Sequence, residues 1–275
     1  MDDRRAPMTE IHPTAIVEPG ARLGAGVSVG AFSTIGPEVE LGDGVTVAGH
    51  VAIAGRTRIG ARCRIHPFAS LGQPPQHLGH KGEATALSIG SDTIIREHAT
   101  MNTGTVEGGG ETRVGNHCFF MAGIHVAHDC RIGDRVIMAN HATLGGHVTI
   151  ADDVVVGGLS AIHQYVRIGR LAMIGGVSGV AMDVIPFALA TGSRARLAGL
   201  NVVGLKRRGM TEPDIAALRT AYRLVFDGEG RLGERLDAAM AAAGDNAAVA
   251  ELVGFIRNLS ERRLLYPRRR QGAVA

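Results

Sequence analysis

The 275-residue sequence has no tryptophan, and aromatic residues make up only 4% of it. A core with so few large rings has to be filled by Val, Ile, Leu and Ala, packed in small repeated layers. Cysteine is also scarce: the three residues Cys63, Cys118 and Cys130 are odd in number and form no C-x-x-C pair. The sequence therefore does not predict a paired-cysteine metal site.

Long hydrophobic runs are missing as well. No run approaches the ~20 apolar residues that a membrane-spanning helix needs. The first ten residues, MDDRRAPMTE, lack the apolar centre of a signal peptide. We therefore expect a cytoplasmic protein with no membrane span.

The formal charge of +3 is small, but it is unevenly distributed. From Phe187 onward there are fifteen Arg and Lys residues against nine Asp and Glu residues. A basic terminal region suits an acidic partner protein, anionic phosphates or nucleic acid. The chain offers no recognised nucleic-acid module, so no nucleic-acid partner is expected.

What the sequence does contain is an apolar, mostly aliphatic residue at every sixth position, in two registers. The positions are Ile11, Val17, Leu23, Val29, Ile35, Leu41, Val47, Ile53, Ile59, Ile65, Leu71, Ile89, Ile95 and Met101, and then, one place out of step, Val114, Phe120, Val126, Ile132, Met138, Leu144, Ile150, Val156, Ile162, Ile168, Ile174 and Val180. The next residue is mostly Gly or Ala, and the fourth residue after each is small or β-branched. This pattern predicts a β-helix in which three repeats complete one triangular coil. The three cysteines occupy the small fourth position, where buried thiols act as small hydrophobes.

Two segments interrupt the repeat, residues 72–88 and residues 107–113, and we expect both to form loops extruded from the coil. Loops on a rigid scaffold often carry binding residues, although a tolerated insertion is an equally good interpretation. After Pro186 the pattern ends, and Thr211 begins a helix signal with an early proline and an acid three residues on. Further helices are expected over 232–243 and 246–259. The predicted division is a β-helix over 1–190 and a helical domain over 191–275.

The stretch Ile-His-Val-Ala-His-Asp-Cys at 124–130 places polar groups inside the aliphatic repeat. Residues eighteen apart lie on neighbouring coils, at the ~4.8 Å spacing of paired strands. His128, Gly146 and Gln164 then form one column, and Asp129, His147 and Tyr165 form the next. We expect four histidines to converge on one edge of the coil: His125, His128, His147 and His163. Histidine titrates near neutral pH, and an adjacent carboxylate can orient its ring, so the cluster predicts general-base chemistry.

The flat faces of such a coil favour association, and we expect a homotrimer with sites in the clefts between subunits. The hexapeptide array, together with IHVAHDC at 124–130, ATLGGH at 142–147, AIHQY at 161–165 and GLNVVGLKRRG at 199–209, resembles the UDP-N-acetylglucosamine O-acyltransferase family. The resemblance covers nearly the whole chain. It implies an all-β left-handed parallel β-helix with a C-terminal helical domain, and transfer of a (3-hydroxy)acyl chain from acyl carrier protein to UDP-N-acetylglucosamine, the first step of lipid A biosynthesis. No cofactor and no metal are implied.

The resemblance also implies roles for individual residues. His128 acts as general base, Asp129 orients it, and the Gly146 N–H stabilises the oxyanion. Gly176 falls where the family measures acyl length, and Lys206 and Arg208 are candidate contacts for the carrier protein. The implied substrate contacts are Gln76, His77, His125, His147, His163, Gln164, Asn201 and Arg207.

The sequence departs from the family in the first loop, where Gln-Asp-Leu-Lys is common and this chain has Gln76-His77-Leu78-Gly79. Val203 also replaces a frequent acid. These changes raise the hypothesis of a 3-amino UDP-sugar acceptor and an amide product. A hexapeptide-fold zinc carbonic anhydrase is the other alternative, because four clustered histidines could bind zinc.

Overall fold

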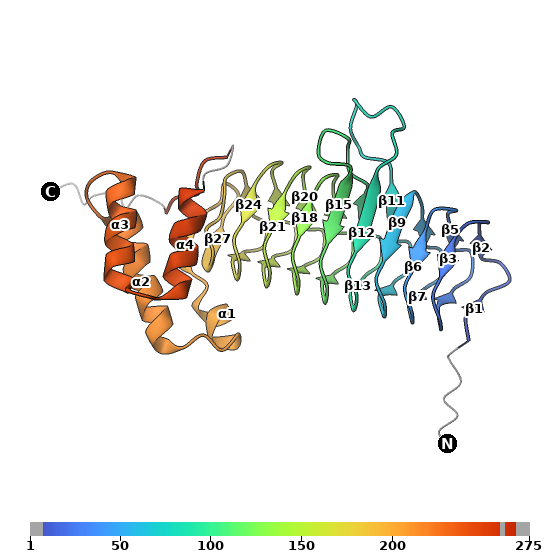
Figure 1. The fold of residues 1–275 in the computed structure, drawn as a ribbon, viewed down its shortest axis with the longest axis horizontal. Coiled ribbons are helices and arrows are strands. Elements are labelled where there is room, and N and C mark those ends of the chain that lie inside the picture. The colour runs from blue at the N-terminus through green and yellow to red at the C-terminus, as the bar shows by residue number, and fades with distance from the viewer. Residues whose placement is uncertain (1–7, 259–261, 268–275) are drawn as a thin grey trace, which may run out of the picture.

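The structure is a computed structural model that describes residues 8–258 and 262–267. Expectations for residues 1–7, 259–261 and 268–275 lie outside the described residues. Within them the chain winds into a long three-sided prism, with a group of helices at the C-terminal end (Figure 1). No helix among the described residues is long and apolar enough to cross a membrane.

Three sheets form the faces of the prism, and consecutive strands up to β27 pass from one face to the next. All pairings of the described strands are parallel except that of β27 with β28, which is antiparallel on the first face. The first face contains β1 (Glu10–Ile11), β4 (Ser28–Val29), β7 (Thr46–Val47), β10 (Arg64–Ile65), β13 (Ile94–Ile95), β16 (Phe119–Phe120), β19 (Ile137–Met138), β22 (Val155–Val156), β25 (Met173–Ile174), β27 (Ala188–Thr191) and β28 (Arg196–Leu200). The second face contains β2 (Ile16–Val17), β5 (Thr34–Ile35), β8 (Ala52–Ile53), β11 (Ser70–Gln73), β14 (Thr100–Asn102), β17 (His125–Val126), β20 (Thr143–Leu144), β23 (Ala161–Ile162) and β26 (Gly179–Val180). The third face contains β3 (Arg22–Leu23), β6 (Glu40–Leu41), β9 (Arg56–Ile59), β12 (Ala86–Ile89), β15 (Glu111–Val114), β18 (Arg131–Ile132), β21 (Thr149–Ile150) and β24 (Arg167–Ile168).

The six-residue repeat sets the strand register. His125 pairs with Thr143, which pairs with Ala161, so each step along the second face is eighteen residues. The second residue of most of the two-residue strands is aliphatic and points into the prism; Ile35, Val126 and Ile174 are fully buried. Cys63, Cys118 and Cys130 are buried in the same core, as predicted, and burial raises the pKa of the Cys130 thiol to about 12. These thiols are therefore packing groups.

Two loops stand out from the prism where the repeat is interrupted (Figure 1). The expected bounds were too wide for the first loop and shifted toward the C-terminus for the second. β11 continues to Gln73 and β12 begins at Ala86, so the first loop covers 74–85 and not 72–88. Likewise β15 begins at Glu111, so the second loop lies at 103–110 and not 107–113. In both cases strand pairing with the neighbouring coils continues without the six-residue marker.

The helical region contains α1 (Val202–Arg207), α2 (Glu212–Asp227), α3 (Leu232–Ala243) and α4 (Ala247–Arg257). Thr211 caps α2 by accepting a hydrogen bond from the Asp214 N–H at 3.3 Å, which confirms the helix start predicted there. α3 has the predicted bounds, and α4 covers most of its predicted range. The sequence pattern did not predict α1, the helix that carries Lys206 and Arg207.

Candidate active site

Three consecutive coils bring the candidate residues together at the edge between the second and third faces. The turn after β17 carries His128 and Asp129, the turn after β20 carries Gly146 and His147, and the turn after β23 carries residues 163–165. Asp129, His147 and Tyr165 all have a positive φ, of 62°, 61° and 65°. This shared corner conformation keeps their side chains in one column, as the eighteen-residue spacing predicts.

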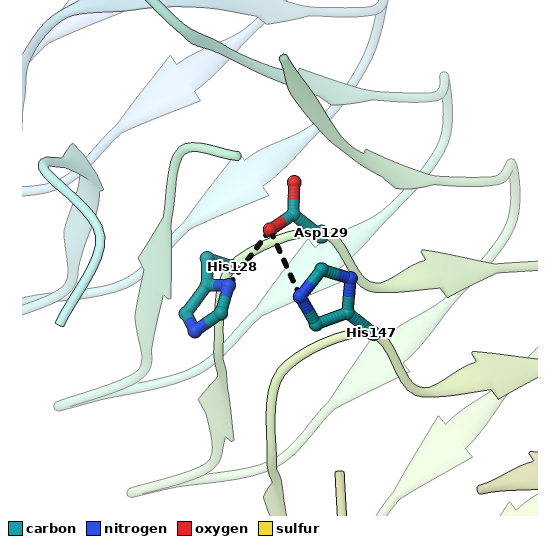
Figure 2. A group of neighbouring side chains, drawn as sticks. All are labelled: His128, Asp129 and His147. Atoms are coloured by element: carbon teal, nitrogen blue, oxygen red, sulfur yellow. Dashed lines mark hydrogen bonds and ion pairs between the residues drawn. The ribbon is translucent and has the colours of Figure 1, made fainter. Parts of the chain in front are cut away.

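The closest charged contact at this edge joins His128 to Asp129. Nδ1 of His128 lies 2.7 Å from Oδ2 of Asp129, and Figure 2 shows the rings of His128 and His147 directed toward this one oxygen. The His128 side chain is 12% exposed and the Asp129 side chain is fully buried. An ionised carboxylate only accepts, so Nδ1 carries the hydrogen and Nε2 keeps a free lone pair. That is the tautomer a general base needs.

Asp129 is held from the other side by the second loop. Its Oδ1 accepts from the Thr105 N–H at 2.8 Å, and its Oδ2 accepts from the Thr105 hydroxyl at 2.7 Å. Its own N–H donates to the Thr112 hydroxyl at 2.8 Å. These bonds fix the carboxylate and satisfy a charge that would be costly to bury alone.

Glycines let the second loop close over this carboxylate. A β-carbon on Gly108 would lie 2.0 Å from Cγ of Asp129, and one on Gly104 would lie 2.8 Å from its Oδ1. No side chain fits at either position. The backbone of the Gly-rich second loop therefore covers the carboxylate of Asp129.

Aromatic rings extend the site along the prism and out to the first loop. His147 Nε2 lies 3.6 Å from Asp129 Oδ2, and the His147 ring stacks on Tyr165 with centroids 4.4 Å apart. His77 reaches from the first loop to pack edge-on against His128, at 5.4 Å between centroids. The structure thus brings the loop residue into the histidine cluster.

Gly146 lies against the imidazole of His128. A β-carbon there would be 2.5 Å from Cε1 of the ring and 2.7 Å from Nε2. The neighbouring Gly145 and His147 N–H groups donate to Ile162 and His128 carbonyls, while no acceptor is assigned to the Gly146 N–H among the described residues. A free N–H beside a general base is the arrangement that oxyanion stabilisation requires.

His125 lies on β17, three residues before His128, and is half-buried. Its Nδ1 lies 2.8 Å from the Thr100 hydroxyl, on the coil below. Burial, and secondly the nearby His128, lower the pKa of His125 below its usual 6.5. His125 is therefore a neutral polar group at neutral pH.

His163 and Gln164 are exposed at the same edge, one coil beyond Gly146. The described contacts of His163 go to Arg262 and to the Gln164 carbonyl, not to the other three histidines. The four predicted histidines lie on or beside this edge, but the described ring contacts join only His77, His128 and His147. The hydrogen bonds of His125 go to Thr100, and the contacts of His163 go to Arg262 and Gln164. Gln76 is exposed in the first loop.

The remaining predicted residues lie near α1. Asn201 caps this helix: its Oδ1 accepts from the Gly204 N–H at 3.1 Å and its Nδ2 donates to the Leu171 carbonyl at 3.0 Å. Arg207 is exposed in the last turn. Lys206 pairs with Glu212 at 2.5 Å, and Arg208 pairs with Asp153 at 2.8 Å. Both proposed carrier contacts therefore already have acidic neighbours.

Gly176 is exposed on the edge between the first and second faces, above Gly158. A β-carbon on Gly176 would lie 3.3 Å from the Gly158 carbonyl oxygen. The space outward from this position is open, so the size of the residue at 176 decides how much room remains there.

His128, Asp129 and His147 also offer three ligand atoms within 4.8 Å of one another, which is the one set of this kind found among the described residues. The 2.7 Å Nδ1–Oδ2 distance, however, is that of a hydrogen bond, and Asp129 Oδ2 also accepts from Thr105. The geometry is therefore that of a hydrogen-bonded pair of side chains.

Sequence reasoning missed several residues that hold the site together: Thr100, Thr105, Thr112 and Arg262. Thr105 lies in the second loop, where the repeat gives no register, and Arg262 comes from the far end of the chain. Only the Gly-rich composition of residues 108–110 signalled a close backbone approach.

Comparisons with known proteins find relatives over most of the chain. A family model described as "Udp N-acetylglucosamine O-acyltransferase; Domain 2" matches residues 183–265, and a bacterial transferase hexapeptide model matches residues 111–146. An acyl-[acyl-carrier-protein]–UDP-N-acetylglucosamine O-acyltransferase of Caulobacter vibrioides is 56% identical over 205 residues, covering 74% of this chain and 78% of the relative. The enzyme of the same name from Azorhizobium caulinodans is 53% identical over 211 residues, covering 77% of each.

Solved structures match over almost the full length. A UDP-N-acetylglucosamine acyltransferase from Campylobacter jejuni is 37% identical, with a TM-score of 0.89 and coverage of 94% of this chain and all of that one. The Francisella novicida structure has a TM-score of 0.91 at 31% identity, with 94% and 95% coverage. These matches confirm the left-handed β-helix, and they favour acyl transfer over the zinc carbonic anhydrase alternative.

Proposed function

Because the chain belongs to the UDP-N-acetylglucosamine O-acyltransferase family, we propose that it transfers an acyl chain from acyl carrier protein to the 3-hydroxyl of UDP-N-acetylglucosamine, the first step of lipid A biosynthesis. The observation that carries the residue assignments is the hydrogen-bonded pair His128–Asp129 beside the Gly146 N–H. Each of the three groups has one task in a direct transfer.

The transfer begins when Nε2 of His128 takes the proton of the sugar 3-hydroxyl. The oxygen attacks the thioester carbonyl, and the negative charge that develops on the carbonyl oxygen is stabilised by the Gly146 N–H. The tetrahedral intermediate then expels the thiolate of the carrier, which takes the proton back from His128. The products are the ester and the free carrier thiol, and no acyl-enzyme is formed. Asp129 holds the imidazole in the required tautomer and stabilises its protonated form.

His128→Ala tests this assignment. Loss of a general base reduces kcat by roughly 10²–10⁴-fold. His117→Ala is the control, because this histidine is 60% exposed on another edge of the prism, and it should leave kcat unchanged. Near-normal turnover of His128→Ala would remove His128 from the mechanism.

The homotrimer is part of the proposal. The edge between the first and second faces carries exposed apolar side chains: Phe32, Phe68, Leu159 and Val177 are 52–65% exposed. Phe32, His50, Phe68 and His98 form a continuous ring stack along it, with centroids 5.0–5.3 Å apart. Such a strip supports burial against a second copy of the chain. Sedimentation of the protein and of Phe68→Glu tests this, with the variant expected to dissociate.

The basic helix α1 is the proposed carrier-protein contact. Lys206, Arg207 and Arg208 are all exposed on or just after it. Lys206→Glu should raise KM for the acylated carrier and leave KM for the sugar nucleotide unchanged, since a rim charge acts mainly on association. A cytoplasmic location belongs to the same proposal and can be tested by cell fractionation.

A second acceptor remains a candidate because His77, and not an acid, packs against the base. The acceptor would be a 3-amino UDP-sugar, and the product an amide. Side-by-side assays of the 3-hydroxy and 3-amino UDP-sugars decide between them. A strong preference for the hydroxyl would remove this candidate.

A further inference from the structure

The segment of residues 262–267, here called the C-terminal strap, returns from the helical region to the last coils of the prism. The Asp183 N–H donates to the Arg263 carbonyl at 2.9 Å, and the Leu265 N–H donates to the Asp183 carbonyl at 2.8 Å. Leu264 and Leu265 are buried. The strap is therefore hydrogen-bonded to the prism through the residues on both sides of Leu264.

The anchor of the strap is itself rigid. The Asp183 side chain is buried and accepts hydrogen bonds from the Arg167 N–H and from Arg167 Nε, both at 2.8 Å. At the other end, the Leu197 N–H donates to the Tyr266 carbonyl at 3.2 Å, and the Tyr266 ring packs edge-on against Phe226 of α2. Arg262 is thus presented from a fixed backbone.

Arg262 uses this position to contact two predicted substrate residues at once. One terminal nitrogen of its guanidinium lies 2.9 Å from Nδ1 of His163, and its Nε donates to the Gln164 carbonyl at 3.0 Å. A guanidinium only donates hydrogen bonds, so Nδ1 of His163 must accept and carries no hydrogen. The 3.2 Å separation between Nδ1 and the Gln164 carbonyl then joins two acceptors, and Arg262 satisfies both of them.

We propose that Arg262 is a positioning residue that holds His163 as the neutral tautomer with hydrogen on Nε2, so that His163 donates a hydrogen bond to an acceptor oxygen of the sugar nucleotide. The inference rests on the proposed function, because that function makes His163 a substrate contact. The C-terminal strap then takes part in acceptor binding, through a contact between residues that are 99 positions apart in sequence. The contrasting role is a purely structural clamp between strap and prism.

The first test is the tautomer itself, which does not depend on activity. Long-range ¹H–¹⁵N spectra of the full-length protein, labelled in its histidines, distinguish the two neutral forms, and His163→Gln assigns the signal. The wild type should show hydrogen on Nε2 alone. Arg262→Ala should show a mixture, while Arg263→Ala, an exposed neighbour in the same strap, should match the wild type. An unchanged tautomer in Arg262→Ala overturns the proposal.

The second test is kinetic. Arg262→Ala and His163→Gln should each raise KM for UDP-N-acetylglucosamine by roughly tenfold to a hundredfold, the range for a hydrogen bond involving a charged group, with a smaller change in kcat. The KM of the double variant should be no higher than that of the single variant with the higher KM. Arg262→Lys should have a KM between those of the wild type and Arg262→Ala. Additive effects, or a tautomer change with normal KM, would overturn the positioning role.

Thermal unfolding of every variant separates these effects from loss of fold. If Arg262→Ala does not fold, Arg262→Gln keeps the side-chain length and serves in its place. A wild-type protein that fails to acylate UDP-N-acetylglucosamine would contradict the proposed function, while the tautomer spectrum would still test Arg262.

Discussion

Gly146 and the imidazole of His128 are in such close contact that a β-carbon on the glycine would lie 2.5 Å from Cε1 of the ring. Gly146→Ala should therefore push the ring off its hydrogen bond with Asp129. A displacement of ~1 Å in a reacting group can cost up to ~10²-fold in rate, so kcat should fall at least about tenfold. Gly36→Ala is the control, since its β-carbon would meet nothing closer than 3.4 Å. Equal kcat values for the two variants would contradict the close approach.

Thr105 gives Asp129 two of its hydrogen bonds, and Thr105→Val removes the one from the hydroxyl. A hydrogen bond to a buried charge stabilises by about 1.5–3 kcal/mol, so urea unfolding should show a loss of this order. Because the carboxylate is freed to rotate, kcat should fall as well. Thr149→Val, at an exposed outward position on the third face, should change neither quantity.

The two departures in the first loop depend on each other. A β-carbon on Gly79 would lie 2.8 Å from Cε1 of His77, so the glycine makes room for the histidine ring. Gly79→Ala should displace His77 and reduce kcat/KM for the acceptor by about as much as His77→Ala. In a His77→Ala background, Gly79→Ala should add little, and the fully exposed Leu78 provides the control as Leu78→Ala. Independent effects at 77 and 79 would show that the two positions are not coupled.

Gly176 is expected to set the room for the acyl chain. Gly176→Met fills the open space outward of the Gly158 carbonyl, so the variant should select shorter acyl chains. Mass spectrometry of products made from a mixed acyl-carrier pool measures the chain-length distribution. An unchanged distribution would place the end of the acyl chain elsewhere.

His125 should make stability depend on pH. Its pKa is lowered in the folded chain by burial and then by His128, so below about pH 6.5 the unfolded chain binds a proton that the folded chain does not. Stability should be complete above pH 6.5 and should fall as pH decreases, by at most about 1.4 kcal/mol per pH unit from this group. His125→Gln should flatten the urea-derived curve between pH 7.5 and 5.5, at one fixed protein concentration. His117→Gln should leave the slope as in the wild type.

The coil and much of its site could be predicted because both follow from one spacing. A six-residue aliphatic repeat fixes the faces, and eighteen-residue steps place Asp129, His147 and Tyr165 in a column. The second loop could not be placed this way. There the step between paired strands is twenty-five residues, from Thr100 to His125, and nothing in the pattern says which loop residue meets Asp129.

Arg262 was hidden for a different reason. It contacts His163 across ninety-nine residues of sequence, and this pairing depends on how the strap is fixed to the end of the prism. The helix α1 was missed because it is only six residues long. Its cap, Asn201, was considered only as a substrate contact, and that contact stays a prediction beside the capping bonds that the side chain makes.

The strand pairing of the first coils has a consequence for how much change in length the molecule can absorb. Every candidate residue on the prism between positions 125 and 165 lies above β11. The turns built from residues 11–65 carry none of these residues, although they contribute Phe32 and His50 to the ring stack proposed for the trimer contact. Removing one complete turn, such as residues 29–46, rejoins equivalent positions, because Val29 pairs with Val47. The candidate site would then lie one coil closer to the N-terminal end, on the same edge of the prism. A deletion of a fraction of a turn would instead rotate the coils that carry the site relative to the coils before the deletion. The segment before the site can therefore be shortened only by whole turns of eighteen residues if the site is to keep its edge.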